Sequence, residues 1–229
     1  MESIYLLPAA LAFLSLSTRS LNIRGAVSAA IMGLLVLWSQ NVYWLSMLLV
    51  FFLVGTGATK IKTEYKKKYG YYQKTRSTEN VIANGGVAML MALSGNVYGF
   101  LGALSTATAD TLSSEIGVLS KSRPRLITNF KRVKTGTDGA MSTLGTAAEV
   151  SGLLIISIFI VIFNMYNGFG NIDLTKTIVI TIVSGFFGCT IDSVIGATIE
   201  RKEIFDNSKT NFVATASGGL MGLLLAFLW

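Results

Sequence analysis

Four acidic side chains lie inside apolar stretches of this chain, and they are the residues best placed to do chemistry. Asp110 and Glu115 share one stretch, Glu149 lies in the next, and Asp192 lies in the one after that. A charged side chain at the centre of a membrane-spanning helix costs about 2.5–3.5 kcal/mol on insertion scales, so each acid requires a reason. Small hydroxyl and glycine residues surround Asp110 and Asp192, with no cation in the same turn. Oxygen ligation of Mg²⁺ or Mn²⁺ is the chemistry that they suit.

The spacing along the helix separates two of these acids. At about 100° per residue, Asp110 shares a face with Ser113 and Ser114. Glu115 lies about 140° away, so a straight helix does not direct both carboxylates at one ion. Either the helix breaks near Ser113, or Glu115 has a separate role, such as orienting a ligand or pairing with a cation. For Glu149, an ion pair with a cation at the membrane interface is an equal alternative to a role in the site.

A glycine-containing turn between the first two acidic stretches has the composition of a phosphate-binding loop. It reads Gly136-Thr-Asp-Gly139 and follows a basic segment that contains Lys131 and Lys134. Glycines permit positive φ, so successive N–H groups can converge on an anion, and the N-terminus of the following helix adds further donors. A polar turn in which Asp138 caps that helix explains the same residues. The Gly-Lys-Ser/Thr order of a Walker A loop is absent.

Two asparagines share one face of another apolar stretch. Asn80 and Asn84 are four residues apart and follow Arg76. They either ligate a metal-bound phosphate or form a hydrogen bond with a neighbouring helix. Asn211, at the start of the last apolar stretch, is a weaker case of the same kind.

The composition indicates that a membrane positions these groups. Only 14% of the 229 residues are charged, against about 25% in soluble domains, and the mean hydropathy is +0.59. The chain has no His and a single Cys, Cys189. This excludes a Ser-His-Asp triad, a His general base, and metal sites built from His or from clustered Cys. Carboxylates, Lys, Arg, hydroxyls, amides and hard metal ions remain.

Eight apolar runs predict an all-α, polytopic integral membrane protein with about eight transmembrane helices, some of them short or broken. The runs span residues of about 4–17, 25–39, 42–59, 80–94, 97–118, 143–164, 174–198 and 212–228. No second domain is expected, so residues 1–229 form a single transmembrane domain.

The cations are confined to alternate connections between the runs. Eighteen of the 19 Lys and Arg lie at residues 19–24, 60–79, 119–142 and 200–211. Under the positive-inside rule, both termini lie outside the cell membrane, and the loops of about 60–79, 119–142 and 200–211 are cytoplasmic. The four acids then lie toward the cytoplasmic ends of their helices. The lysine- and tyrosine-rich stretch at 60–74 is typical of a surface for anionic lipids, and we expect no nucleic acid as a partner.

Three strings in this chain resemble a known family. They are Thr108-Ala-Asp-Thr-Leu-Ser-Ser-Glu-Ile-Gly117, Gly136-Thr-Asp-Gly-Ala-Met-Ser142 with Gly145-Thr146, and Ile191-Asp-Ser-Val-Ile-Gly-Ala-Thr198. In this order they resemble the integral-membrane family of transmembrane protein 19 and plant phytyl-phosphate kinase, which is distantly similar to dolichol kinase and phosphatidate cytidylyltransferase. The resemblance extends from about Arg76 to the C-terminus, and the first 75 residues match only in hydropathy.

The resemblance implies Mg²⁺-dependent transfer of a phosphate from CTP to an isoprenyl monophosphate, such as phytyl or geranylgeranyl phosphate. The residues that fall in motif positions are Asn80, Asn84, Asp110, Glu115, Lys131, Asp138 and Asp192. We expect the catalytic residues to be Asp110, Asp192 and Lys131, and the metal ligands to be Asp110, Asp192 and Glu115. The residues expected to bind nucleotide or phosphate are Arg76, Asn80, Asn84, Ser114, Glu115, Arg125, Lys134, Gly136, Thr137, Asp138, Gly139, Ser142 and Asn211.

The isoprenyl chain is expected in a lateral groove between the helices, open to lipid, with CTP at the cytoplasmic face. Two other functions remain open. A cytidylyltransferase would place CMP on the lipid phosphate, and an ion-coupled transporter would also use intramembrane acids and glycine-rich helices. The expected partners are the isoprenyl monophosphate, the nucleoside triphosphate and membrane lipids, and a homo-oligomer is also open.

Overall fold

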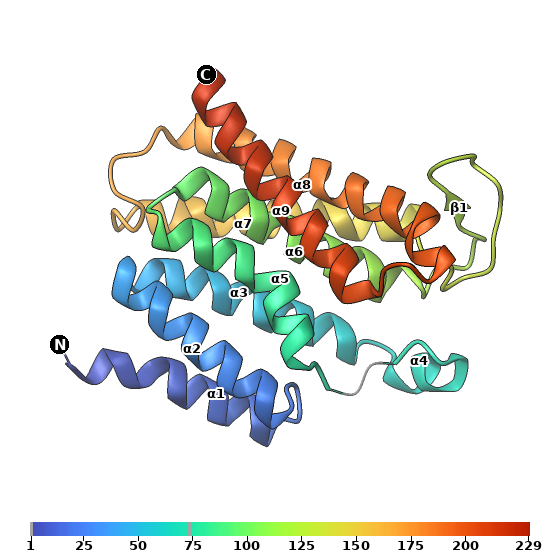
Figure 1. Cartoon of the computed structure of the whole chain (residues 1–229), viewed down its shortest axis with the longest axis horizontal. Helices are drawn as coiled ribbons and strands as arrows, with labels where there is room; N and C mark the ends of the chain where they lie inside the picture. Colours follow the sequence, from blue (N-terminus) through green and yellow to red (C-terminus); the bar gives the residue numbers. More distant parts are fainter. Residues whose placement is uncertain (1, 73–74) are drawn as a thin grey trace.

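The computed structural model describes residues 2–72 and 75–229, and this part of the chain is a bundle of α-helices (Figure 1). A 3-10 turn (Glu2–Leu6) leads into α1 (Leu7–Ser17), α2 (Ile23–Ser39), α3 (Val42–Lys60), the short α4 (Thr63–Tyr69), α5 (Thr78–Leu93) and α6 (Val97–Gly117). The strands β1 (Arg125–Leu126) and β2 (Ala140–Met141) precede α7 (Thr143–Asn164), α8 (Leu174–Thr198), a second 3-10 turn (Glu200–Lys202) and α9 (Asn207–Leu228). Lys74, one of the cations counted in the 60–79 connection, lies outside the described residues.

Each of the eight apolar runs forms a helix, so the prediction of an all-α, polytopic membrane protein is confirmed. Within the described residues, four helical segments are long and apolar enough to cross a membrane: Val42–Lys60, Thr143–Asn164, Leu174–Lys202 and Asn207–Leu228. The helices α1 and α2 are apolar but shorter, and α5 has only 16 residues. The helix α6 runs unbroken from Val97 to Gly117, so the break considered near Ser113 does not occur.

Side-chain caps explain where several helices begin. The caps of α2, α3 and α6, which accept hydrogen bonds from backbone N–H groups in the first turn, are Asn22, Asn41 and Asn96. The carboxylate of Asp206 accepts a hydrogen bond from the N–H of Lys209 at 2.9 Å. This cap starts α9 at Asn207 rather than near residue 212, so the third cation-rich loop is shorter than predicted.

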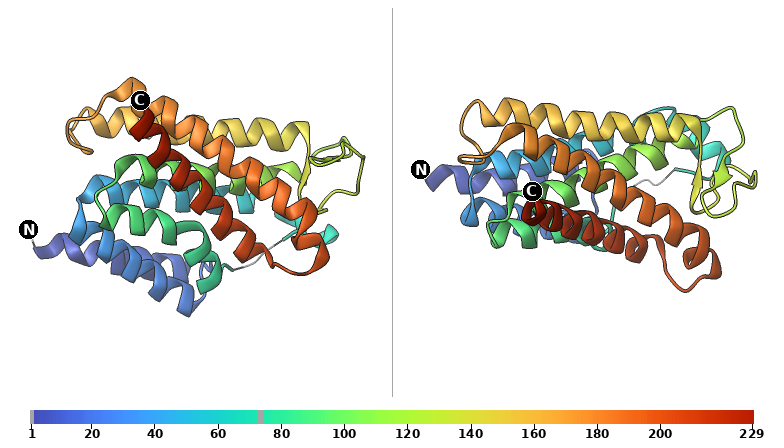
Figure 2. Two further views of the ribbon diagram at one scale, coloured as in Figure 1. Left: turned by 45° about the horizontal axis from the view of Figure 1, so that its top comes forward. Right: turned by 90° about the horizontal axis from the view of Figure 1, so that it is seen from above.

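The cation-rich connections gather at one end of the bundle, here called the loop end. Figure 1 shows α4, the 119–142 loop with β1, and the turn between α8 and α9 at this end. The two termini lie toward the opposite end, as both views in Figure 2 also show. Termini on one side are what an even number of crossings requires, in agreement with the alternation of charge in the sequence.

The buried core is built around α6. Every residue of α6 from Gly99 to Ala109 is buried, and the helix packs against α3, α5, α7, α8 and α9. Small residues on the neighbouring helices make this packing possible, because a Cβ on Gly188 of α8 or Gly218 of α9 would collide with the side chain of Thr106. The C-terminal half of α6 therefore emerges from the core at the loop end, where it carries Asp110.

Candidate active site

A polar cavity of about 90 Å³ lies at the loop end of the bundle. Seven of the nine residues that line it are among those predicted to bind metal, nucleotide or phosphate: Arg76, Asn80, Asn84, Asp110, Ser114, Glu115 and Asn211. The other two, Thr111 and Asn207, were not predicted. Asn207 and Asn211 are four residues apart on α9 and repeat the spacing of Asn80 and Asn84 on α5. That repeated spacing is the sequence signal that could have found Asn207.

Two carboxylates meet beside this cavity. The side chains of Asp110 on α6 and Asp192 on α8 lie within hydrogen-bonding reach of each other. Oδ1 of Asp192 is buried and has no hydrogen-bond partner, and the same holds for Oδ1 of Asn84, which lines the cavity from α5. Buried oxygens without donors are costly. Mg²⁺ is usually bound through one or two carboxylates plus substrate phosphates, so these oxygens fit such an ion.

Glu115 does not belong to this oxygen set. Its Oε2 accepts a hydrogen bond from Nζ of Lys66 at 2.6 Å, and its Oε1 lies 2.7 Å from the hydroxyl of Thr59. In the described part of the chain, no three His, Cys, Asp or Glu side chains are grouped closely enough to hold a metal ion. The prediction of a metal site built from three carboxylates is therefore wrong. An unbroken α6 turns Glu115 away, and the carboxylate pairs with a cation instead.

Lys66 is a further residue of this region that the sequence analysis missed. It is fully buried, and its Nζ also donates to the carbonyl oxygens of Ala58 at 2.8 Å and Thr59 at 3.3 Å. These carbonyls belong to the last turn of α3, so Lys66 joins α4 to the ends of α3 and α6. In the sequence it is one of several lysines in a basic loop, and no local signal distinguishes it from its neighbours.

Glu149 is buried in α7 and faces Asp110 and Cys189. The three ion pairs found among the described residues do not include it. The alternative in which Glu149 pairs with a cation at the membrane interface is therefore not what the structure shows. Its carboxyl group lies near Asp110 and within hydrogen-bonding reach of Cys189 instead.

Arg76 contributes a positive charge to the same cavity that Asp110 lines. Its N–H donates to the carbonyl of Ser20 and its carbonyl accepts from the N–H of Asn22, both at 3.1 Å. Its guanidinium packs against α3, where a Cβ on Gly55 would lie 3.1 Å from both terminal nitrogens. Hydrogen bonds to the α1–α2 turn and a glycine on α3 thus place this cation.

The charges of Lys66, Arg76 and Glu115 together favour the binding of an anion next to Arg76. Burial lowers the pKa of Arg76 from its ordinary value, and the nearby Glu115 carboxylate opposes that change. An arginine remains protonated at neutral pH under such conditions. Lys66 and Arg76 together carry two positive charges against the single negative charge of Glu115. One positive charge is left over, and it belongs to the residue that lines the cavity.

The predicted glycine turn has the backbone geometry expected of it, with φ of 81° at Gly136 and 67° at Gly139. However, the N–H of Thr137 donates to the carbonyl of Lys134, and the N–H of Ala140 donates to that of Thr137. Two of the donors expected for a phosphate are thus used within the loop. These two N–H groups already have backbone carbonyls of the same loop as partners, so they are not free to bind an anion.

The cap of α7 is Ser142 rather than Asp138. The hydroxyl oxygen of Ser142 accepts a hydrogen bond from the N–H of Gly145 at 3.0 Å and lies 3.2 Å from the carbonyl of Gly117. This hydroxyl is engaged in holding α7 against the end of α6, so its predicted contact with phosphate is replaced by a structural role. The suggestion that Asp138 caps this helix is also wrong.

The basic side chains of the 119–142 loop point away from the core. Arg125, Lys131 and Lys134 are exposed, and the guanidinium of Arg125 donates to the carbonyl of Phe130 at 3.0 Å. No residue of this loop is among those found to line the polar cavity in the described structure. The predicted roles of these cations, and of residues 136–139, toward phosphate stay predictions.

Gly139→Ala is expected to lower the free energy of unfolding by about 2–5 kcal/mol, measured by thermal and denaturant unfolding in detergent. The left-handed backbone costs a non-glycine residue about 1–2 kcal/mol, and overpacking adds about 1–3 kcal/mol. The overpacking arises because a Cβ there would collide with the backbone of Ala197 in α8. Gly170→Ala is the matched control, since its φ is 72° but nothing lies within 4 Å. Equal losses in the two variants would contradict the packing of this turn on α8.

The chain matches the family described as integral membrane protein DUF92 over residues 6–219. It belongs to this DUF92 family. The match runs from the start of α1 to just past the middle of α9, so every residue of the polar cavity lies within it. The resemblance to a membrane family that was inferred from the three motif strings is thereby confirmed.

Relatives of this DUF92 member occur in archaea and plants. An uncharacterized membrane protein of Methanocaldococcus jannaschii is 36% identical over 221 residues, which cover 94% of this chain and 90% of the relative. Protein PGR of Arabidopsis thaliana is 28% identical over 218 residues, with 83% and 75% covered. Protein VTE6, chloroplastic, of the same plant is 28% identical over 223 residues, with 90% and 65% covered. No solved structure matches the chain.

Proposed function

We propose that this protein is a membrane kinase that transfers a phosphate from CTP to an isoprenyl monophosphate and yields the diphosphate. The observation that carries the proposal is one cavity lined both by the cation Arg76 and by Asp110, whose side chain is in contact with Asp192. Phosphoryl transfer is catalysed mainly by positioning and charge neutralisation, which such a pair of walls provides. The resemblance to plant phytyl-phosphate kinase, and the similarity to Protein VTE6, support the substrate class.

The metal fits one part of this cavity. Asp110 and Asp192 would hold Mg²⁺, or Mn²⁺ in its place, with the side-chain oxygen of Asn84 beside them. When bound, the ion supplies positive charge to the phosphates of the nucleotide. Arg76 binds the phosphate of the isoprenyl substrate and keeps it in line with the nucleotide.

The chemistry requires no protein base. An oxygen of the isoprenyl monophosphate, already ionised near neutral pH, attacks the γ-phosphorus of CTP. The new P–O bond forms as the bond between the γ-phosphorus and the β-phosphate oxygen breaks, and CDP leaves with that electron pair. No proton has to be removed from the nucleophile, which accords with a chain that contains no His.

We place the cavity on the cytoplasmic face of the cell membrane, with both termini outside. The gathering of cation-rich connections at the loop end supports this orientation through the positive-inside rule. The exposed cations Arg125, Lys131 and Lys134 then face the cytoplasm. There they attract the nucleoside triphosphate toward the cavity before it binds.

The test uses purified protein with Mg²⁺, geranylgeranyl or phytyl monophosphate, and CTP that is labelled separately at the α- and γ-phosphates. Label from the γ-position in the extracted lipid, with CDP released, is the expected result. Label from the α-position would identify a cytidylyltransferase, which places CMP on the lipid and releases pyrophosphate. No lipid label with CTP or any other nucleotide, and no stabilisation of the protein by nucleotide, would favour a transporter.

Gly55→Ala tests the position of Arg76. The added methyl group would lie 3.1 Å from both guanidinium nitrogens and displace them by a few tenths of an ångström. We expect the KM for the isoprenyl phosphate to rise about 3–10-fold, because a small misplacement of a binding group is costly. Gly57→Ala, two residues away on α3 with nothing within 4 Å, is the control. An unchanged KM in both variants would contradict the role of Arg76.

A further inference from the structure

A second cavity lies on the other side of Arg76. It has a volume of about 110 Å³ and is lined mainly by α1, α2, α3 and α5. Its walls are apolar apart from Arg76, Asn80 and Ser15, and the hydroxyl of Ser15 donates within α1 to the carbonyl of Ala12 at 2.7 Å. Arg76 and Asn80 line both this apolar cavity and the polar one. The two cavities therefore share a wall that is made by this pair of polar residues.

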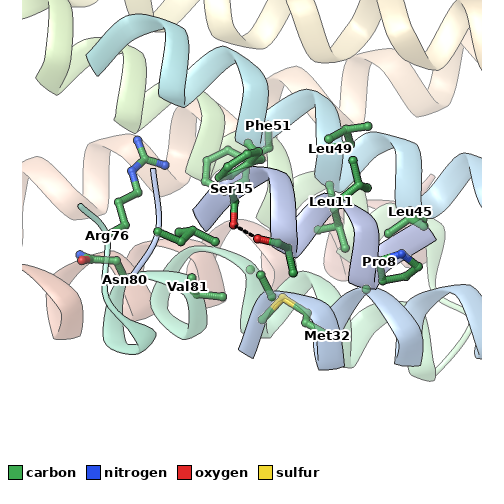
Figure 3. A pocket seen from close by; sticks show the side chains of 17 residues that line it. Pro8, Leu11, Ser15, Met32, Leu45, Leu49, Phe51, Arg76, Asn80 and Val81 are labelled. Atoms are coloured by element: carbon green, nitrogen blue, oxygen red, sulfur yellow. Dashed lines mark hydrogen bonds between the residues drawn. The ribbon is translucent and has the colours of Figure 1, made fainter. Parts of the chain in front are cut away.

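The apolar cavity is elongated and polar at one end only. It follows α1 from Pro8 to Ser15 and α3 from Leu45 to Phe52, a distance of about 10 Å at the rise of a helix. Figure 3 shows Arg76 and Asn80 at one end and Pro8 and Leu45 at the other. At that far end, a Cβ on Gly33 would lie 3.2 Å from both Pro8 and Leu45, so the helices close the cavity there.

We propose that this apolar cavity binds the part of the isoprenyl chain next to the phosphate, and that Arg76 at its mouth holds the phosphate itself. The proposal rests on the proposed function, which supplies the substrate class, and it adds the location of the hydrocarbon. A slot with one cation at one end is complementary in charge and polarity to a single-chain amphiphile with an anionic head. The phosphate then faces Asp110 across the polar cavity.

The volume of the apolar cavity matches the first isoprene unit of a branched chain. An apolar cavity of about 150 Å³ is known to stay dry and bind benzene, so about 110 Å³ suits a unit of five carbons. The flexible side chain of Met32 lines the cavity and lies against Gly85, and a methionine can rearrange to admit more of the chain. A phospholipid carries two chains on glycerol and matches a single slot less well.

Photochemical labelling locates the hydrocarbon whether or not phosphate is transferred. The full-length protein in nanodiscs is mixed with geranylgeranyl phosphate that carries a diazirine in its first isoprene unit, irradiated, and mapped by mass spectrometry. We expect labels on Pro8–Ser15, Ala29–Gly33, Leu45–Phe52 and Asn80–Gly85, and we expect excess geranylgeranyl phosphate to remove them. Labels on other helices would overturn the proposal. Labels that excess phosphatidylglycerol removes equally well would make the cavity an ordinary lipid site and overturn it too.

Two variants that fill the cavity provide the second measurement. Ala12→Leu on α1 and Ala29→Leu on α2 add volume from different walls. Each should reduce the photolabel, and the kcat/KM for both geranylgeranyl phosphate and dimethylallyl phosphate, at least tenfold, because the five-carbon unit next to the phosphate is common to the two substrates. The control is Ala10→Leu, because Ala10 is exposed on α1 and does not line the cavity. An unchanged kcat/KM for dimethylallyl phosphate, or an equal loss in the control, would contradict the proposal.

The two failures can be told apart. If the labels map to the cavity and respond to Ala12→Leu but no nucleotide phosphate reaches the lipid, the proposed reaction is wrong and the binding site stands. If γ-phosphate is transferred while the labels map elsewhere, the reaction stands and the binding site is wrong.

Discussion

Asp110→Asn is expected to lower the rate of phosphate transfer about 10³-fold, the scale on which removal of one charged group from a reaction centre acts. The substitution keeps the shape of the side chain but removes its charge from the Asp110–Asp192 pair. Mg²⁺ would then lose a carboxylate at the point where the nucleotide phosphates must be neutralised. The stabilisation of the protein by CTP with Mg²⁺, measured by thermal unfolding in detergent, should fall with the rate.

The control for Asp110→Asn is Asp206→Asn. Asp206 also lies at the loop end, is exposed, and caps α9 through a bond that asparagine can make as well. Asp206→Asn removes one negative charge from the same region and should leave both the rate and the stabilisation within about twofold. Normal turnover by Asp110→Asn would rule out the assignment of the metal to this pair. An equal loss of rate in both variants would show that the effect comes from the change in net charge and not from the loss of a metal ligand.

Lys66→Met is expected to destabilise the protein by about 3 kcal/mol, as measured by unfolding in detergent. The fully buried ammonium bonds to Glu115 and to two carbonyls at the end of α3, and the exposed fraction of the Glu115 side chain is only 17%. Breaking a buried ion pair from one side costs about 3–5 kcal/mol because the other charge is left uncompensated, and partial exposure places this pair at the lower end.

Two comparisons separate this effect from other losses. Lys67→Met breaks the exposed pair with Glu64 and should cost less than about 1 kcal/mol. The double variant Lys66→Met with Glu115→Leu removes both members of the ion pair and should recover most of the loss. If Lys66→Met were no more harmful than Lys67→Met, the junction of α4 with α3 and α6 would not exist in the protein in solution.

The sequence predicted part of the polar cavity because its residues are spaced by the helix period. Asn80 and Asn84 lie one turn apart on α5, and Asp110 and Ser114 do so on α6, so each pair had to present one face. Asp110 and Asp192 were each singled out because an acid inside a membrane helix costs free energy, and the structure brings the two into contact. What the sequence could not supply is which helix lies beside which, since hydropathy does not distinguish one neighbour from another.

Long-range contacts explain the errors. Glu115 was assigned to the metal because it falls in a motif position, although the helix spacing left a pairing with a cation open; the cation is Lys66, which is 49 residues away. Ser142 was assigned to phosphate because it follows a glycine turn, yet its hydroxyl caps α7 and meets the carbonyl of Gly117. A hydroxyl or carboxylate takes the nearest satisfactory partner in space, and separation along the chain does not reveal that partner.

The sequence by itself determined the class of this protein, its helices, and the end of the bundle at which its polar groups gather. These features follow from partition between lipid and water, which depends on the composition of each segment alone. Only the tertiary structure decided that Arg76 stands between a polar and an apolar cavity. Its place there depends on hydrogen bonds to Ser20 and Asn22 and on the absence of a side chain at Gly55. Those contacts join segments more than 20 residues apart, and they exist only once the helices have packed.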